Sequence, residues 1–103
     1  MVKIKWSKQA LSDLKIIFVY IANDSRRYAN DTINQIIHST EILKSQPFVG
    51  RIVPEFNVKN IREIFYKSYR IVYQIENNFK VDVLGVFHSA RILKLTFFKQ
   101  SEE

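Results

Sequence analysis

The stretch that decides the fold is residues 61–87, which read IREIFYKSYRIVYQIENNFKVDVLGVF. β-Branched and aromatic residues dominate it, and side chains of different polarity alternate along much of it, as is typical of strands. Short polar breaks divide the stretch into residues 61–66, 69–76 and 79–87. The pattern therefore predicts three strands that follow one another along the chain, with tight turns between them.

Upstream of this stretch the period of the pattern changes. Residues 2–6 alternate between apolar and lysine side chains, which predicts one half-buried strand. Apolar residues then recur every three or four positions through residues 8–23 and again through residues 26–45, which predicts two helices. Because only a short polar link separates the two helices, we expect them to form an antiparallel hairpin. Prolines and a glycine mark residues 46–57 as a loop.

The expected order of elements is β-α-α-β-β-β, with helices and strands segregated along the chain. This order predicts the α+β class, with an antiparallel helical hairpin packed on a mainly antiparallel four-stranded sheet. A short C-terminal helix or an extended tail is expected at residues 92–98. At this length, we interpret residues 1–103 as a single domain.

Composition and charge exclude several classes of function. The chain has no cysteine, so disulfides, thiolate metal sites and cysteine nucleophiles are absent. Its two glycines form no phosphate-binding loop, and its two histidines show no metal-ligand spacing. With 16 Lys and Arg against 10 Asp and Glu, the formal charge of +6 favours an anionic partner. No apolar stretch is long enough to span a bilayer, so we expect a cytoplasmic protein without membrane contact.

The candidate binding residues are three arginines and a histidine in the strand-rich half of the chain: Arg62, Arg70, His88 and Arg91. Arg70 interrupts an apolar strand, so it must leave the core, pair with a carboxylate such as Glu55 or Glu63, or hold an anion. Arg91 follows the next strand, and two arginines converging on one spot would suit a phosphate group. His88 ends that strand, where a turn residue and a contributor to a site are both open interpretations.

Four motifs in this half of the chain occur in a familiar order. They are Pro47-x-x-Gly50-Arg51-x-Val53-Pro54-Glu55, Ile61-Arg62-Glu63-Ile64, Tyr69-Arg70-Ile71-Val72-Tyr73 and Val86-x-His88-x-Ala90-Arg91-x-Leu93. Together they resemble the RelE/ParE superfamily of toxins from bacterial type II toxin–antitoxin modules, also called plasmid stabilisation proteins. The expected opening strand and helical hairpin match the layout of this superfamily as well.

The resemblance implies one of two targets. RelE-like members are ribosome-dependent endoribonucleases that cut messenger RNA without a metal, and in that pattern Arg70 and Arg91 would be the catalytic arginines. However, the lysines of RelE-like members fall here near Ile61 and Glu63, and their tyrosine falls on Phe97. None of these side chains can replace the missing groups in proton transfer.

ParE-like members are poisons of DNA gyrase that act by binding, and the motifs match this branch better. The resemblance therefore favours a binding-type gyrase inhibitor over an endoribonuclease, with growth arrest as its effect and with no metal or other cofactor. In this branch Arg62, Arg70, His88 and Arg91 would serve the fold or a target- or anion-binding surface. Either branch implies a cognate antitoxin in a hetero-oligomeric complex. A third alternative is a member that has lost toxicity and only binds its antitoxin.

Overall fold

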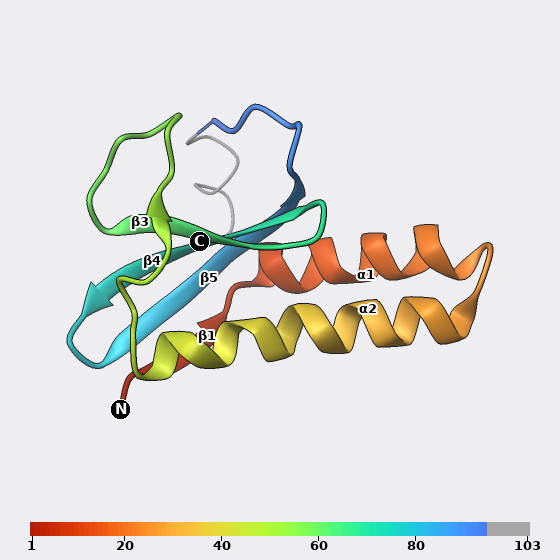
Figure 1. The fold of residues 1–103 in the computed structure, drawn as a ribbon, viewed down its shortest axis with the longest axis horizontal. Helices are drawn as coiled ribbons and strands as arrows, with labels where there is room; N and C mark the ends of the chain where they lie inside the picture. Colours follow the sequence, from red (N-terminus) through yellow and green to blue (C-terminus); the bar gives the residue numbers. More distant parts are fainter. Residues whose placement is uncertain (95–103) are drawn as a thin grey trace.

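The computed structural model describes residues 1–94. Along these residues the elements are β1 (Lys3–Trp6), α1 (Lys8–Ala22), α2 (Arg26–Ser39), the 3₁₀ helix η1 (Thr40–Lys44), β2 (Arg51–Ile52), β3 (Ile61–Tyr66), β4 (Tyr69–Asn77) and β5 (Lys80–His88). The strands form one sheet, and the helical hairpin extends beyond it at one end (Figure 1). The predicted α+β class is confirmed.

The sheet has the strand order β1-β5-β4-β3-β2. The pairs β2–β3, β3–β4 and β4–β5 are antiparallel, whereas β1 pairs parallel with β5. The sheet is therefore mainly antiparallel, as predicted, but it has five strands among residues 1–94 instead of four. The additional strand is β2, inside the expected loop, where Arg51 pairs with Glu63 and Ile52 with Arg62. A strand of two residues is too short to show a periodic pattern, which is why the sequence did not reveal it.

The two helices begin at serine caps. The Oγ atom of Ser7 accepts a hydrogen bond from the N–H of Ala10 (3.0 Å) at the start of α1, and Ser25 caps α2 in the same way. Ser7 also donates its hydroxyl to the carbonyl of Leu84 in β5 (3.1 Å). The cap thus satisfies a helix N–H that has no partner in the helix and also fastens α1 to the sheet.

The prediction placed the end of the second helix too far along the chain. We expected it to reach residue 45, but the α-helix ends at Ser39 and continues as η1. Here the hydroxyl of Ser39 donates to the carbonyl of Ile36 (2.6 Å), and that of Thr40 donates to the carbonyl of Ile37 (2.7 Å). Side-chain hydroxyls that bond to nearby carbonyls in this way compete with the regular helical pattern, and 3₁₀ turns are frequent at such helix ends.

Apolar side chains cover both faces of the sheet. The residues that pack between the helices and the sheet include Ala10, Leu14, Ile36, Ile71, Val83 and Val86. The opposite face carries a smaller cluster of Val53, Ile61, Val72, Leu84, Phe87 and Leu93. Because β4 is central, its residues Ile71, Val72 and Tyr73 are fully buried. This strand therefore holds Arg70, at its beginning, next to the second cluster.

The C-terminal expectation is tested only in part. Residues 92–94 adopt neither helix nor strand, and the rest of the expected helix or tail, with Phe97, lies outside the described residues. Within residues 1–94, neither long helix combines the length and the apolar character that crossing a membrane requires.

Candidate arginine cluster and groove

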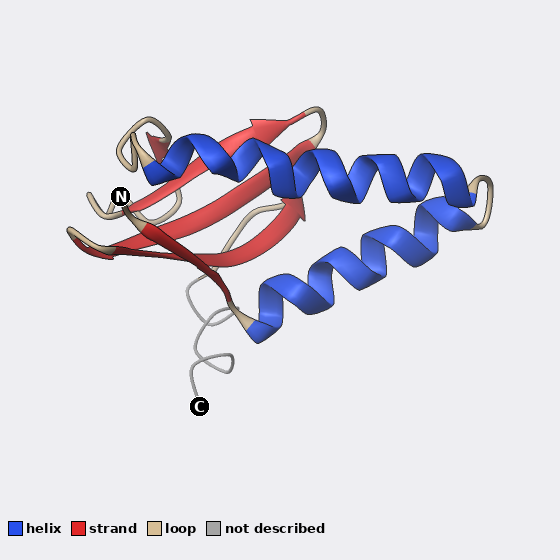
Figure 2. Cartoon of the chain, turned by 90° about the horizontal axis from the view of Figure 1, so that it is seen from below, coloured by secondary structure: helices blue, strands red, loops and turns tan. Residues whose placement is uncertain are grey.

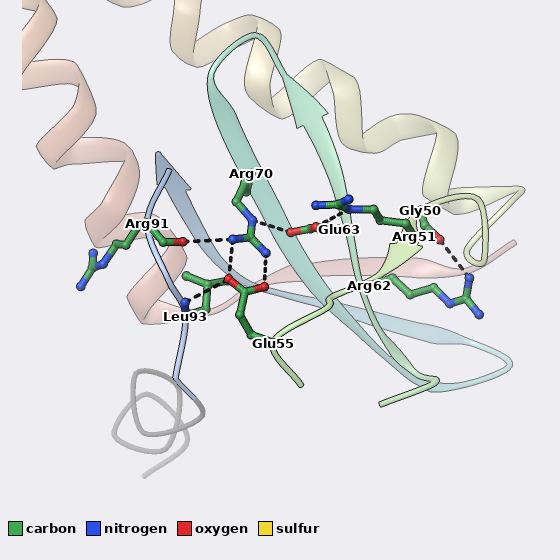
Figure 3. Close-up of polar contacts among 8 residues, drawn as sticks. All are labelled: Gly50, Arg51, Glu55, Arg62, Glu63, Arg70, Arg91 and Leu93. Carbon is green, nitrogen blue, oxygen red and sulfur yellow. Dashed lines mark hydrogen bonds and ion pairs between the residues drawn. The ribbon is translucent and has the colours of Figure 1, made fainter. Parts of the chain in front are cut away.

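The guanidinium group of Arg70 lies between two carboxylates (Figure 3). Its Nε donates to Oε1 of Glu63 (2.6 Å), while Nη1 and Nη2 donate to the two carboxylate oxygens of Glu55 (2.7 and 2.8 Å). Nη1 also donates to the backbone carbonyl of Arg91 (3.0 Å). Both carboxylate partners that the sequence suggested for Arg70 are therefore confirmed, and Arg70 binds them at the same time.

Much of this cluster is buried, so its charges depend on one another and not on water. The side chain of Arg70 is 5% exposed and that of Glu63 is 0% exposed. Glu63 also accepts a hydrogen bond from Nε of the exposed Arg51 (2.6 Å). The paired hydrogen bonds from Arg70 lower the pKa of Glu55 to about 2, and the same bonds raise the pKa of Arg70. In a fork-to-fork pair of this kind both groups stay charged.

The cluster joins four segments of the chain. Arg70 is the second residue of β4, Glu63 lies in β3, and Glu55 belongs to the loop between β2 and β3. The carboxylate of Glu55 also accepts the N–H of Leu93 (3.2 Å), beyond the end of β5. The cluster therefore fastens the segment after β5 across the face of the sheet that the helices leave open.

The structure does not bring the side chains of Arg70 and Arg91 together. Figure 3 shows the Arg91 side chain directed away from the Arg70 guanidinium, so that only its backbone carbonyl meets Arg70. The guanidinium of Arg91 lies over the ring of Phe87, 5.5 Å from its centroid. The hypothesis of two guanidinium groups converging on one phosphate thus has no geometric support here.

Arg62 fastens a loop to the sheet. Its Nη1 donates to the carbonyls of Gly50 (2.9 Å) and Phe48 (3.1 Å), and its Nε donates to the carbonyl of Lys59 (3.0 Å). Its guanidinium also stacks on Phe48, 4.9 Å from the ring centroid. These contacts account for Arg62 as a positioning residue for the loop that precedes β2.

The same loop is fixed from inside by Tyr73. Its hydroxyl donates to the carbonyl of Pro47 (2.6 Å) and accepts the N–H of Gly50 (3.0 Å). A Cβ atom at Gly50 would lie 2.6 Å from this hydroxyl and 2.6 Å from the carbonyl of Glu63. In the Pro47-x-x-Gly50 motif, glycine is therefore needed because the loop and the sheet approach each other closely at this position.

His88 and Arg91 share a groove between α1 and the end of β5. The groove has a volume of about 380 Å³, and its lining includes Asp13, Ile16, Tyr20, Tyr69, His88 and Arg91. His88 and Arg91 are both exposed. His88 also accepts the N–H of Ala90 at Nδ1 (3.2 Å), so it satisfies a turn and lines the groove as well. Both interpretations of His88 thus agree with its position.

Asp13 is a groove residue that we did not predict from the sequence. Its carboxylate accepts the N–H of Val86 (2.9 Å) and the amide of Gln9 (2.8 Å). Burial raises the pKa of Asp13, while these hydrogen bonds and Arg91 act against the rise. Gly85 leaves room for it, because a Cβ atom there would come within 3.0 Å of the carboxylate. The available signal was an acidic residue on the inward side of a helix, next to Leu14.

Among residues 1–94, no group of His, Cys, Asp and Glu side chains is placed to hold a metal ion. The carboxylates of Glu55 and Glu63 already bind the guanidinium groups of Arg51 and Arg70. Arg51 and Arg70 are therefore the cations that these two carboxylates bind.

Residues 4–93 match the family model described as "ParE toxin of type II toxin-antitoxin system, parDE". The chain belongs to the ParE toxin family. It is also similar in fold to a solved structure titled "Chromosomal ParDE TA system from P. aeruginosa", with a TM-score of 0.71 and 18% sequence identity, over 85% of this chain and 96% of that chain. None of the curated proteins matches it. Membership in the ParE family confirms the predicted branch of the superfamily and implies a cognate antitoxin as partner.

Proposed function

We propose that this member of the ParE family is a toxin that poisons DNA gyrase in the cytoplasm by binding, and that a cognate antitoxin neutralises it. Family membership supports this proposal. The structural observation that supports action by binding is that the guanidinium of Arg70 is buried and bound by Glu55 and Glu63. We further propose that residues 1–103 act as one domain and form a hetero-oligomer with the antitoxin.

The Arg70 cluster supports binding in preference to RNA cleavage. A metal-independent ribonuclease needs cationic groups free to stabilise the charge that develops on the phosphate, together with an acid and a base. To bind a phosphate, Arg70 would have to release a carboxylate, and release of Glu63 would leave a buried charge without its partner. The geometry therefore supports a structural role for Arg70 in preference to a catalytic one.

Among the four candidate residues, we assign contact with a target to His88 and Arg91. Arg70 is buried in the cluster, and Arg62 holds the loop before β2. In contrast, His88 and Arg91 are exposed and line a groove with the 77% exposed Tyr20. Aromatic and arginine side chains are the residue types that most often dominate binding energy at protein interfaces. We therefore propose that this groove contacts the gyrase.

The test is pulse labelling of DNA and protein synthesis in bacteria that express this chain without its antitoxin. We expect DNA synthesis to fall first and growth to stop, and co-expression of the antitoxin should prevent both effects. The variant Arg91→Glu should weaken the effect, whereas Lys59→Glu, an exposed charge reversal in another loop, should not.

Three outcomes would contradict the proposal. An earlier fall of protein synthesis would favour the endoribonuclease. No change in either synthesis would favour a family member that only binds its antitoxin. Full activity of the Arg91→Glu variant would remove the proposed role of the groove.

A further inference from the structure

Four of the five tyrosines of the chain gather where the helical hairpin meets the turn between β3 and β4. The link between the two helices lies beyond the ends of the strands (Figure 2). Tyr20 lies in the last turn of α1 and Tyr28 in the first turn of α2, next to this link. Tyr66 and Tyr69 face each other at the start of the β3–β4 hairpin, and Tyr69 lines a groove together with Tyr20. Residues of both helices and of two strands thus contribute rings to one region.

Lys67 connects these rings from the turn between β3 and β4. Its Nζ lies 5.6 Å from the ring centroid of Tyr28 and 5.6 Å from that of Tyr66. Its φ of 51° is in the left-handed region, where a two-residue hairpin turn usually has Gly, Asn or Asp. A lysine there costs backbone free energy, and an outlier of this kind points to a function of the side chain.

Three exposed cations of this region form no salt bridge within residues 1–94. They are Lys67 and the two arginines that begin α2, Arg26 and Arg27. The exposed Asp24 and Asp31 of the same hairpin pair with none of them. Because the first turn of a helix favours acidic side chains, the two arginines do not serve the stability of α2.

Two of the four rings are open to solvent. Tyr20 is 77% exposed and Tyr28 is 51% exposed, whereas Tyr66 and Tyr69 are half-buried against the core. Proteins bind single-stranded nucleic acid with this combination, since bases stack on aromatic rings and cations meet the phosphates. A duplex suits such rings poorly, because the neighbouring base pairs already cover the faces of its bases.

We propose that Tyr20, Tyr28, Lys67, Arg26 and Arg27 form a surface that binds single-stranded DNA. Bases would stack on the two exposed rings, and phosphates would meet the three cations. The inference goes beyond the proposed protein contact with gyrase, and it rests on that proposal only for the source of the DNA. An acidic protein segment would also meet the cations, but rings and charges in alternation suit a chain of bases and phosphates better.

The test measures binding of a fluorescently labelled thymidine decanucleotide to the full chain by anisotropy. One control ligand is an abasic decanucleotide, which has the same phosphates but no bases, and the other is a DNA duplex of the same length. We expect the thymidine strand to bind more tightly than either control ligand, because it alone combines phosphates with uncovered bases.

The variant Tyr28→Ala tests the stacking. It should weaken binding of the thymidine strand about fivefold or more and leave binding of the abasic strand unchanged. Phe79→Ala is the matched control, because Phe79 is a 74% exposed ring in the turn at the opposite end of β4. It should change the affinity for neither strand.

The variant Lys67→Gly separates recognition from a structural role. Glycine tolerates positive φ, so the turn should keep its stability. Binding of the thymidine and abasic strands should both weaken, and the slope of log affinity against log salt should become smaller by about 0.7. Lys59→Gln, an exposed lysine before β3, should leave the slope unchanged. A less stable Lys67→Gly chain that binds DNA normally would overturn the inference.

Other outcomes would also overturn it. They are equal binding of the thymidine and abasic strands, full binding by Tyr28→Ala, and equal binding of a ten-glutamate peptide, which would indicate a protein segment as the ligand. A clear preference for a uridine decanucleotide would overturn the assignment to DNA. If the chain inhibits gyrase but does not bind the thymidine strand, this inference fails while the proposed function stands. If it binds the strand but leaves gyrase active, the reverse holds.

Discussion

Nε of Arg70 lies 2.6 Å from Oε1 of Glu63, and neither side chain is more than 5% exposed. This pair connects the beginning of β4 to β3 on the face of the sheet that lies away from the helices. Its two charges neutralise each other in a poorly solvated place, where each depends on the other. A motif arginine that looks like a phosphate ligand in the sequence is therefore part of the framework of the fold.

Replacement of Arg70 should damage stability far more than replacement of Arg91. In Arg70→Ala, the buried Glu63 and its neighbour Glu55 lose their shared partner, and we expect a loss of about 3–5 kcal/mol in the free energy of unfolding. Arg91→Ala removes an exposed side chain but keeps the backbone carbonyl that Arg70 uses, so its loss should stay within about 1 kcal/mol. Urea denaturation of both variants measures the difference. Equal losses would contradict the structural role of Arg70.

Acid should weaken the fold through Glu55. Arg70 holds the pKa of Glu55 at about 2 in the folded protein, below its ordinary value of 4.5. The folded state therefore binds fewer protons than the unfolded state between these values. The resulting stabilisation is complete above about pH 4.5 and is lost as the pH falls toward 2.

The variant Glu55→Gln isolates this contribution. It should be less stable than the natural chain at neutral pH, and the difference between the two should shrink as the pH falls through this window. Asp13, whose pKa burial raises, acts in the opposite direction in both proteins and cancels in the comparison. Thermal unfolding across the acidic range gives the measurement. A difference that stays constant with pH would contradict the assignment.

Loss of the Tyr73 hydroxyl should loosen the loop before β2. In Tyr73→Phe, the carbonyl of Pro47 and the N–H of Gly50 lose their partner in a buried place, which should cost about 1–3 kcal/mol. Tyr20→Phe removes the same group from a 77% exposed side chain and should change stability by no more than about 0.5 kcal/mol. Denaturant titration compares the two variants, and an equally small effect of Tyr73→Phe would contradict the anchoring role.

The architecture was largely predictable because its elements carry long periodic patterns. The strands of residues 61–87 and both helices depend on such patterns, and each begins within a few residues of its predicted start. Strand β2 has only two residues, and the end of α2 depends on the hydroxyls of Ser39 and Thr40. Neither feature leaves a periodic signal.

The candidate site was predictable only as a set of alternatives. From the sequence, a carboxylate partner and an anion are equivalent explanations for Arg70, because both satisfy a guanidinium group. The choice depends on the distances that bring Glu55 and Glu63 to it from two other segments. The direction of the Arg91 side chain likewise depends on the path of the chain after β5, where no regular element sets it.

The most direct test of the proposed function is DNA supercoiling by purified gyrase in the presence of this protein. We expect the natural chain to inhibit supercoiling, Arg91→Glu to require about tenfold more protein for the same inhibition, and Lys59→Glu to match the natural chain. Addition of the cognate antitoxin should restore supercoiling. Undiminished supercoiling at a molar excess of folded natural protein would contradict the proposal that this ParE family member acts on gyrase.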